Sequence, residues 1–404
     1  MNQPLSRPSI EQVRIRNYRA LRQVELRGLS RLTVLVGPNG SGKSTVLDAL
    51  AFVSDAFRVG LHQAWKNRGC GRDLKTRGQN GPIEIGIAYR ESAGGELITY
   101  RLQIDEENER PVVTDEKVTT KARRGGEPET VLHYVKGHGE VITRGPTSST
   151  VHTILVGTDL LAVNVFGQFQ DNPILAGLRR FILDWQRFEL SIANLRGQAV
   201  GGPQERLNET GDNLANVILY LGRNDPDRLG FVFRVLAQRV PQVETVLAEE
   251  MTDGRLLLRI KDAPFQDPML ARFASDGTLK LLAFLILLHQ SKPPALIGVE
   301  EPENYLHPRL MYPLAEAFRV ATERSQLLVT THSPYFLDAV RPEEVRVLYR
   351  DQHGYTQAQR AADLRGVREF MEHGGQLGDL WMEGQFNVGD PLTNSGMPRL
   401  AGGR

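Results

Sequence analysis

The segment from Gly37 to Thr45 reads GPNGSGKST and constrains the fold of this 404-residue chain more than any other feature. Its pattern, G-x-x-x-x-G-K-S/T, places glycines where a backbone can approach a phosphate closely and puts a lysine at the start of a helix. The apolar run Leu32–Val36 predicts a buried strand before the loop, and residues 44–57 have helical spacing after it. A strand, a glycine-rich loop and a helix in this order predict a nucleotide-binding α/β fold.

Each part of this phosphate loop has an expected role. Its backbone N–H groups would hold the phosphates of ATP, and Lys43 would reach the β- and γ-phosphates. Ser44 would ligate Mg²⁺, and the Thr45 hydroxyl would lie near the α-phosphate. The alternative is a glycine-rich turn that binds nothing, which the strand and helix on either side disfavour. The predicted nucleotide-binding residues are Gly37, Pro38, Asn39, Gly40, Ser41, Gly42, Lys43, Ser44 and Thr45.

A second apolar strand ends in two acids. Residues 295–301 read ALIGVEE, and a parallel core strand delivers its last residues to the edge of the sheet where ligands bind. We expect Glu300 to hold Mg²⁺ and Glu301 to activate the attacking water as a general base. Two solvated acids at a strand end are the alternative for this segment taken alone.

Two shorter segments complete the pattern. Residues 275–278, SDGT, precede the apolar helix predicted over 278–289, and they combine hydroxyls, a glycine and a helix N-terminus as an anion site does. In isolation an ordinary helix cap is the favoured interpretation of this segment, and its position among the other motifs reverses that preference. His332 follows the apolar run 327–331, where its ring can donate to a γ-phosphate oxygen. A packed histidine without a role is the alternative there.

The composition gives the chain no overall charge that would attract nucleic acid. The formal net charge is +1, so binding of nucleic acid would need a local basic patch. Cys70 is the single cysteine, which excludes an intramolecular disulfide and is typical of a reducing cytoplasm. The longest apolar run, residues 281–288, is too short for a membrane span of about 20 residues. We expect a soluble, cytoplasmic protein without a membrane partner.

The ordered set of segments resembles the ABC-type ATPase heads of the SMC/RecF-like class, in particular the compact AAA-family ATPases that lack a coiled coil. The phosphate loop alone occurs in many folds, whereas the complete set is much more specific. The resemblance covers the chain from about residue 10 to 350. It is carried by IRNYR at 15–19, GPNGSGKST at 37–45, SDGT at 275–278, VEEPENYLHP at 299–308 and THSPYFL at 331–337.

The resemblance implies an α/β fold of the P-loop, ABC-ATPase-head type. Its mixed central sheet would carry an antiparallel β insertion, which short alternating runs also predict, and a helical lobe. One composite ATPase domain is expected over residues 1–350. Its parts would be 10–82 with the first strands and the phosphate loop, 83–145 with the β insertion, 165–270 as a mostly helical lobe, 271–350 with the remaining motifs, and then 351–404 as a C-terminal extension.

In that class, SDGT-like segments complete the γ-phosphate site of the opposite subunit in a head-to-tail homodimer. The resemblance therefore implies that Ser275 and Gly277 touch the partner's ATP, that Glu301 is the catalytic base and that His332 is a switch histidine. Residues 304–307 would cross the dimer interface. For the glutamine that contacts the metal, both Gln168 and Gln170 are candidates, and Gln168 is preferred.

The sequence departs from the family pattern at three positions. Glu300 stands where the pattern often has Asp, which lengthens the metal ligand by one methylene group. Because Mg²⁺ keeps several waters, the longer ligand is tolerable, but it leaves the turnover rate open. The other two lie at the SDGT segment, 275–278, which is called the signature segment below. Ala274, directly before it, replaces the usual leucine, and Asp276 within it replaces a glycine.

Three functions remain open at this level. The first is an ATP-hydrolysing switch in DNA maintenance, repair or anti-phage defence, and the second is an ATP-dependent dimerisation module that controls a separate effector protein. The third, a kinase, does not explain SDGT or His332. DNA is a candidate partner because basic residues gather at 66–77 and again at 121–124, although a solvated basic face is an equally good interpretation. No nuclease site is evident in the sequence.

Overall fold

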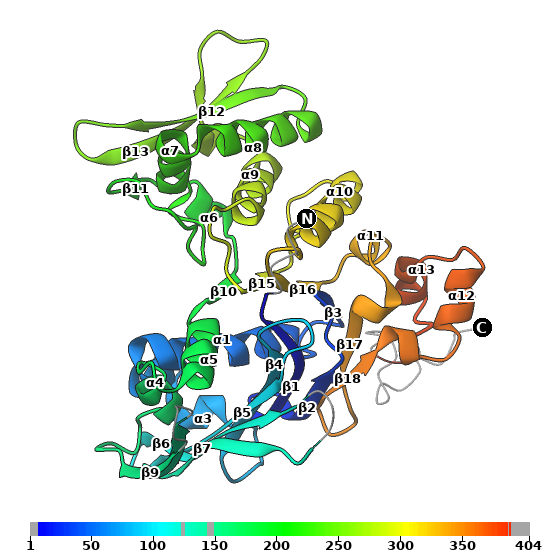
Figure 1. The fold of residues 1–404 in the computed structure, drawn as a ribbon. Helices are drawn as coiled ribbons and strands as arrows, with labels where there is room; N and C mark the ends of the chain where they lie inside the picture. Colours follow the sequence, from blue (N-terminus) through cyan, green and yellow to red (C-terminus); the bar gives the residue numbers. More distant parts are fainter. Residues whose placement is uncertain (1–6, 123–125, 144–148, 387, 389–404) are drawn as a thin grey trace. The chain divides into compact units, whose positions relative to one another are not determined.

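The computed structural model describes residues 7–122, 126–143, 149–386 and 388, and it contains two compact units (Figure 1). Unit 1 comprises Met1–Leu183 and Val340–Arg404, and unit 2 comprises Asp184–Ala339. The phosphate loop therefore belongs to unit 1, whereas the acids at 300–301 and His332 belong to unit 2. That both units form one composite domain stays a prediction.

Unit 1 contains an eight-stranded antiparallel sheet in the order β2-β1-β4-β5-β6-β7-β8-β9. The predicted insertion forms its meander from β4 to β8, because alternate side chains along these strands are apolar and buried. The first two strands of the chain pair with each other in the same sheet, and β9 extends it beyond the predicted insertion. The strands are β1 (Ser9–Tyr18), β2 (Leu21–Arg27), β4 (Ile83–Arg90), β5 (Leu97–Glu107), β6 (Arg110–Lys121), β7 (Glu129–Val135), β8 (His138–Thr143) and β9 (Ser149–Ile154).

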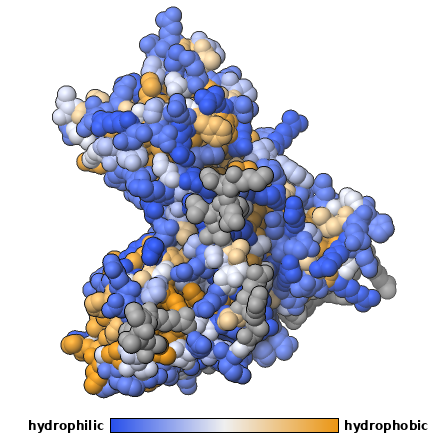
Figure 2. Space-filling view, viewed as in Figure 1, coloured by the Kyte–Doolittle hydropathy of each residue, from blue (hydrophilic) through white to orange (hydrophobic). Residues whose placement is uncertain are grey.

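Strand β9 forms one edge of this sheet, and its side chains are mostly exposed. Apolar side chains gather on the surface around it, and Figure 2 shows them at the lower left of the molecule. They are Val135, Val151, Ile154, Val156 and Leu160.

Three further strands of unit 1 hold the phosphate loop. The fully buried β3 (Leu32–Val36) pairs in parallel with β17 (Val345–Arg350), which pairs antiparallel with β18 (Thr356–Arg360). The segment expected as a C-terminal extension thus begins with a strand of the sheet that carries the loop. The helices of unit 1 are α1 (Lys43–Val59), α2 (Leu61–Lys66), α3 (Cys70–Leu74), α4 (Ala162–Phe166), α5 (Pro173–Leu183), α12 (Val367–Glu372) and α13 (Leu377–Met382).

Unit 2 contains a parallel β layer in which β15 (Leu296–Glu300) pairs with β10 (Trp185–Phe188) and with β16 (Gln326–Thr331). Each of these two strands is followed by a helix, since β15 leads to α10 (Met311–Ala321) and β16 leads to α11 (Pro334–Leu337). Helix α9 (Asp276–Leu288) is buried along nearly its whole length, as its uniformly apolar sequence predicts. None of the helices within the described ranges is long and apolar enough to cross a membrane.

The expected helical lobe at 165–270 is only partly helical. Helices α6 (Ile192–Leu195), α7 (Leu214–Asn224) and α8 (Pro226–Arg239) are present, and Figure 1 shows α7 and α8 beside β12 and β13. The prediction of a mostly helical lobe was wrong at β12 (Val243–Glu250), which is a strand. A bulge at Val243–Thr245 brings Val243 and Val246 to the buried side, and this spacing of three imitates a helix. The other strands of this sheet are β11 (Ala199–Val200), β13 (Arg255–Asp262) and β14 (Met269–Leu270).

Candidate functional site

The phosphate loop in unit 1 has a buried lysine at its centre. Lys43 Nζ donates to the carbonyl oxygens of Gly37, at 2.8 Å, and Pro38, at 3.1 Å. The ammonium group therefore lies against the loop and not in solvent. Ser41 Oγ is also buried, and it has no hydrogen-bond partner within the part of the chain that the structure describes. A buried positive charge beside an unsatisfied hydroxyl fits a bound anion, as the phosphate-loop prediction requires.

The two hydroxyl residues after Lys43 differ in their surroundings. Ser44 is exposed on the first turn of α1. Thr45 lines a cavity of about 560 Å³ within unit 1. Basic residues from three separate segments of unit 1 also line this cavity, namely Arg19, Arg72, Lys75, Arg77, Arg350 and His353. A cavity with this charge beside the phosphate loop suits the rest of a nucleotide or another polyanion.

The basic stretch at 66–77 is not a uniform basic face. Arg68 points inward, where it bonds Asp48 at 3.0 Å and Asp55 at 2.7 Å. Lys75 pairs with Asp105. The guanidinium groups of Arg72 and Arg77, by contrast, belong to the cavity beside Thr45. In the second basic stretch, residues 123–125 lie outside the described residues.

The carboxylate turn in unit 2, residues 300–305, brings the predicted base and the predicted histidine together. Glu301 follows β15 in the left-handed conformation, with a φ of 42°, and its N–H donates to the carbonyl oxygen of Thr330 at 3.0 Å. His332 Nε2 lies 3.2 Å from Glu301 Oε1, and Asn304 Nδ2 donates to Glu301 Oε2 at 2.8 Å. A carboxylate held by contacts on both oxygens has a fixed orientation, which suits a general base.

Glu303 organises the same turn, and sequence reasoning gave it no role. One of its oxygens, Oε1, accepts bonds from Thr331 Oγ1 at 2.8 Å, from the His332 N–H at 2.6 Å and from the Ser333 N–H at 3.2 Å. The carboxylate thus fixes the end of β16 from which His332 projects. In the sequence, the only local sign that these donors need an acceptor is the run of three polar residues, 331–333, at the end of an apolar strand.

Glu300, the predicted metal ligand, lies beside a residue that the sequence analysis did not identify. Arg187 Nε is 3.6 Å from Glu300 Oε1, and the same nitrogen donates to Glu209 at 2.8 Å. The pairing follows from β10 and β15 running side by side, because Arg187 is opposite Gly298. The guanidinium group therefore places a positive charge beside the proposed metal ligand.

The signature segment 275–278 contacts the carboxylate turn within unit 2. Ser275 caps α9, with its Oγ accepting from the Thr278 N–H at 3.2 Å. A Cβ atom on Gly277 would lie 2.8 Å from the carbonyl oxygen of Tyr305, so the absence of a side chain allows this approach. Lys280 is buried, and its Nζ lies 3.4 Å from the carbonyl oxygen of Glu301. Burial lowers the pKa of Lys280, although Glu303 and Glu301 oppose that shift.

The contacts among the described residues of unit 1 do not join Gln168 or Gln170 to the phosphate loop. Gln168 Nε2 donates to the carbonyl oxygen of Asn164, one turn back in its own segment, at 2.9 Å. Both glutamines are exposed. Neither therefore gains support as a metal ligand from the contacts of unit 1, and the assignment stays a prediction.

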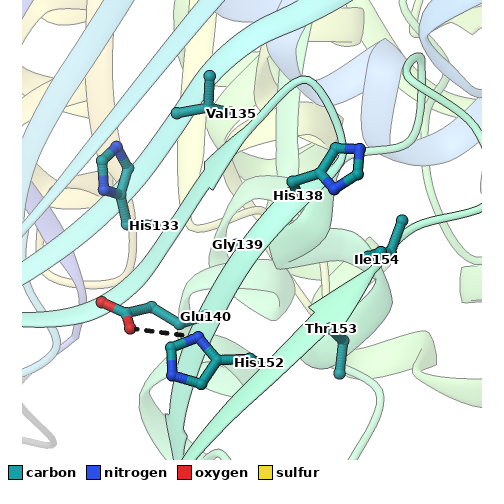
Figure 3. A pocket seen from close by; sticks show the side chains of 8 residues that line it. All are labelled: His133, Val135, His138, Gly139, Glu140, His152, Thr153 and Ile154. Atoms are coloured by element: carbon teal, nitrogen blue, oxygen red, sulfur yellow. Dashed lines mark ion pairs between the residues drawn. The ribbon is translucent and has the colours of Figure 1, made fainter.

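A second hollow in unit 1 lies on strands β7, β8 and β9 and holds three histidines (Figure 3). His152 Nδ1 lies 3.7 Å from Glu140, whereas the His133 ring is directed away from this pair and bonds Asp115 at 3.1 Å. Within the described residues no group of three or more His, Cys, Asp or Glu side chains is placed to hold a metal ion.

Comparisons with known proteins agree with this geometry. Residues 9–133 match a family described as "AAA ATPase domain", and residues 172–338 match one described as "AAA domain, putative AbiEii toxin, Type IV TA system". The first match includes the phosphate loop, and the second includes the signature segment, the carboxylate turn and His332. An OLD nuclease of Thermus scotoductus is 22% identical over 91% of this chain and 68% of its own length.

Among solved structures, an SMC head bound to the C-terminal winged-helix domain of ScpA matches with a TM-score of 0.52 and 15% identity. The match covers 87% of this chain and 96% of that one. The chain has the fold of an SMC/RecF-like ABC-type ATPase head. The fold class and the resemblance stated from sequence are thereby confirmed. An SMC head with an extended coiled coil from Pyrococcus furiosus is 14% identical, with a TM-score of 0.48, over 90% of this chain and all of that one.

Proposed function

We propose that this ABC-type head binds ATP together with Mg²⁺ and hydrolyses the bond between its β- and γ-phosphates. The observation that carries the proposal is the phosphate loop itself, in which the buried Lys43 ammonium and the unsatisfied Ser41 hydroxyl adjoin a basic cavity. The loop and Lys43 would bind the phosphates, and the cavity beside Thr45 would take the rest of the nucleotide. Both features are built from unit 1, so this unit would supply most of the binding free energy.

Hydrolysis would depend on the carboxylate turn of unit 2. Glu301 would accept a proton from the attacking water, and His332 would contact the γ-phosphate. Their separation of 3.2 Å supports a shared task, because each can restrict the orientation of the other. Ser44 and Glu300 are the residues proposed to hold Mg²⁺, which would supply positive charge to the phosphate oxygens. Arg187 would help to orient the Glu300 carboxylate.

ATP would also join two copies of the chain head to tail, with Ser275 and Gly277 of each copy contacting the nucleotide held by the other. The contact between Gly277 and Tyr305 supports this proposal, because it links the signature segment to the catalytic turn of the same copy. The similarity to SMC heads and to an OLD nuclease favours work on DNA, in maintenance, repair or anti-phage defence, in the cytoplasm. A separate effector protein is the other candidate partner.

Turnover assays on three proteins test the assignment. Wild type should hydrolyse ATP, Lys43→Ala should lose nucleotide binding, and Glu301→Gln should bind ATP while its kcat falls about 10²–10⁴-fold. Equal turnover in all three proteins would show that the site is wrongly assigned. Negligible turnover in wild type, together with tight ATP binding, would favour a dimerisation module that regulates an effector.

Solution mass tests the dimer. Glu301→Gln saturated with Mg·ATP should have twice the monomer mass and should return to monomer with ADP. A strictly monomeric Glu301→Gln protein that has bound ATP would contradict the head-to-tail proposal. The same ATPase assay with and without duplex DNA, at two salt concentrations, would test the DNA proposal, because contacts to phosphates weaken steeply with salt.

A further inference from the structure

Two carbonyl groups of the phosphate loop accept hydrogen bonds from side chains of the β17–β18 hairpin. Arg350 Nε donates to the carbonyl oxygen of Gly40 at 2.6 Å, and Thr356 Oγ1 donates to the carbonyl oxygen of Ser41 at 2.8 Å. Both donors lie more than 300 residues away in the sequence. Thr356 is fully buried, and its own N–H donates to the carbonyl oxygen of Ala20 at 3.1 Å, which fixes its position.

The direction of these carbonyls decides where the loop's N–H groups point. In a planar trans peptide unit the C=O and the following N–H point in opposite directions. Thr356 therefore aims the Gly42 N–H away from the hairpin. Arg350 does the same for the Ser41 N–H, which donates to the carbonyl oxygen of Pro38 at 3.2 Å and so closes the turn of the loop. A loop that binds phosphate through N–H groups gains affinity when their orientation is fixed beforehand.

The glycines of the loop show how closely the hairpin approaches. A Cβ atom on Gly42 would lie 2.6 Å from Thr356 Oγ1, and a Cβ atom on Gly37 would collide with the carbonyl oxygen of Leu348 in β17. Two glycines that the motif predicts for contact with phosphate are thus also required for contact with the hairpin. On the side of the hairpin the loop is in contact with main chain, with the Thr356 side chain and with the Arg350 guanidinium group.

We propose that Thr356 and Arg350 are positioning residues for nucleotide binding, and that the β17–β18 hairpin is a structural part of the phosphate-binding site. The inference rests on the proposed ATP binding and adds to it a group outside the motif that sets the geometry of the loop. Thr356 acts only through the Ser41 carbonyl. Arg350 also lines the basic cavity, so Thr356 gives the sharper test.

The test compares Thr356→Val, which keeps the branched shape and removes the hydroxyl, with Thr356→Ser, which keeps the hydroxyl. Calorimetric titration should show Kd values for ATP and ADP that rise together by about 10-fold in Thr356→Val, the effect of losing one hydrogen bond. Thr356→Ser should stay within about threefold of wild type. The kcat at saturating ATP should change less than KM, because the catalytic groups are untouched.

Thr33→Val is the matched control. Thr33 is equally buried in unit 1, and its hydroxyl donates to the carbonyl oxygen of Ser30 at 3.2 Å, away from the phosphate loop. It should lower thermal stability as Thr356→Val does but leave the Kd for ATP unchanged. If Thr33→Val weakens ATP binding as much as Thr356→Val, or if Thr356→Ser fails to restore it, the effect is general destabilisation and the proposal is wrong.

A second variant keeps the test decisive if Thr356→Val does not fold. Arg350→Met changes an exposed side chain and should also raise both Kd values about 10-fold. Unchanged affinity in that variant would overturn the proposal. Failure of wild type itself to bind ATP would instead remove the proposed function, so the two outcomes are distinguishable.

Discussion

The phosphate loop of unit 1 and the carboxylate turn of unit 2 both follow buried strands, but they are held in different ways. The loop is fixed through its main-chain carbonyls, which accept bonds from Lys43, Arg350 and Thr356. The turn is fixed through side chains, because the Glu303 carboxylate accepts three bonds from the end of β16 and Glu301 contacts His332.

This difference fits the two tasks proposed for these segments, phosphate binding by the loop and catalysis by the turn. A loop that binds phosphate through N–H groups must keep its peptide units in one orientation, and bonds to the carbonyls achieve this directly. A catalytic carboxylate must keep its oxygens in place while protons move, so a network of ionisable side chains suits it. Changes in the turn should therefore alter kcat, and changes around the loop should alter the affinity for nucleotide.

Of the changes compared in the following paragraphs, Glu300→Gln is expected to lower the ATPase rate most. The substitution keeps the size of the proposed metal ligand and removes its charge, so kcat should fall about 10²-fold or more and the Mg²⁺ concentration for half-maximal activity should rise. A magnesium titration of the ATPase rate measures both. Glu209→Gln is the control, because Glu209 also pairs with Arg187. Equal losses in both variants would show that Arg187, and not metal binding, is responsible.

Glu303→Gln should lower kcat about 10-fold with little change in the Kd for ATP. A neutral amide accepts weaker bonds from the segment 331–333, so His332 would be less firmly held. Steady-state kinetics and calorimetry together provide the comparison. Glu205→Gln, which removes an ion pair to Lys292 elsewhere in unit 2, should change neither value. A rise in Kd without a loss of kcat would contradict the assignment of the turn to catalysis.

Gly277→Ala should destabilise the protein by about 1–3 kcal/mol, since its Cβ would lie 2.8 Å from the Tyr305 carbonyl oxygen and one of the two must shift. Denaturant unfolding of the protein without nucleotide measures the loss. Gly222→Ala in α7 is the control. There the nearest atom would be Leu229 Cδ2 at 3.6 Å, and the helix should gain about 0.5–1 kcal/mol. Equal stabilities would show that the signature segment does not pack on the turn.

The last prediction concerns Glu116 in unit 1, which should affect only the pH dependence of the unfolding free energy. Burial raises its pKa to about 7, although it accepts bonds from the N–H groups of Ala162 and Val163. Because the folded pKa exceeds the unfolded one, the contribution of Glu116 to stability is complete below about pH 4.5 and is lost as the pH rises through about 7. Unfolding free energies should thus fall by on the order of 1–3 kcal/mol between these limits, and Glu116→Gln should flatten that slope. The same slope in both proteins would contradict the prediction.

Local patterns predicted the elements that carry short-range signals. The strand before the phosphate loop, the helix after it, the antiparallel meander and the apolar helix α9 follow from spacing that neighbouring residues impose. The prediction failed at β12, where the bulge at Val243–Thr245 altered the spacing. It also gave no role to Glu303 or Arg187, because their partners lie on other strands.

The sequence by itself determined which residues are candidates for the proposed chemistry. Residue types at fixed spacing specify a phosphate loop, a pair of acids after a strand and a histidine after another, since each motif is local. Only the tertiary structure decided what supports them. Thr356 and Arg350 reach the loop, and Glu303 reaches the end of β16, through contacts between segments that are far apart in the chain. Such contacts depend on strand order and packing, which no local spacing encodes.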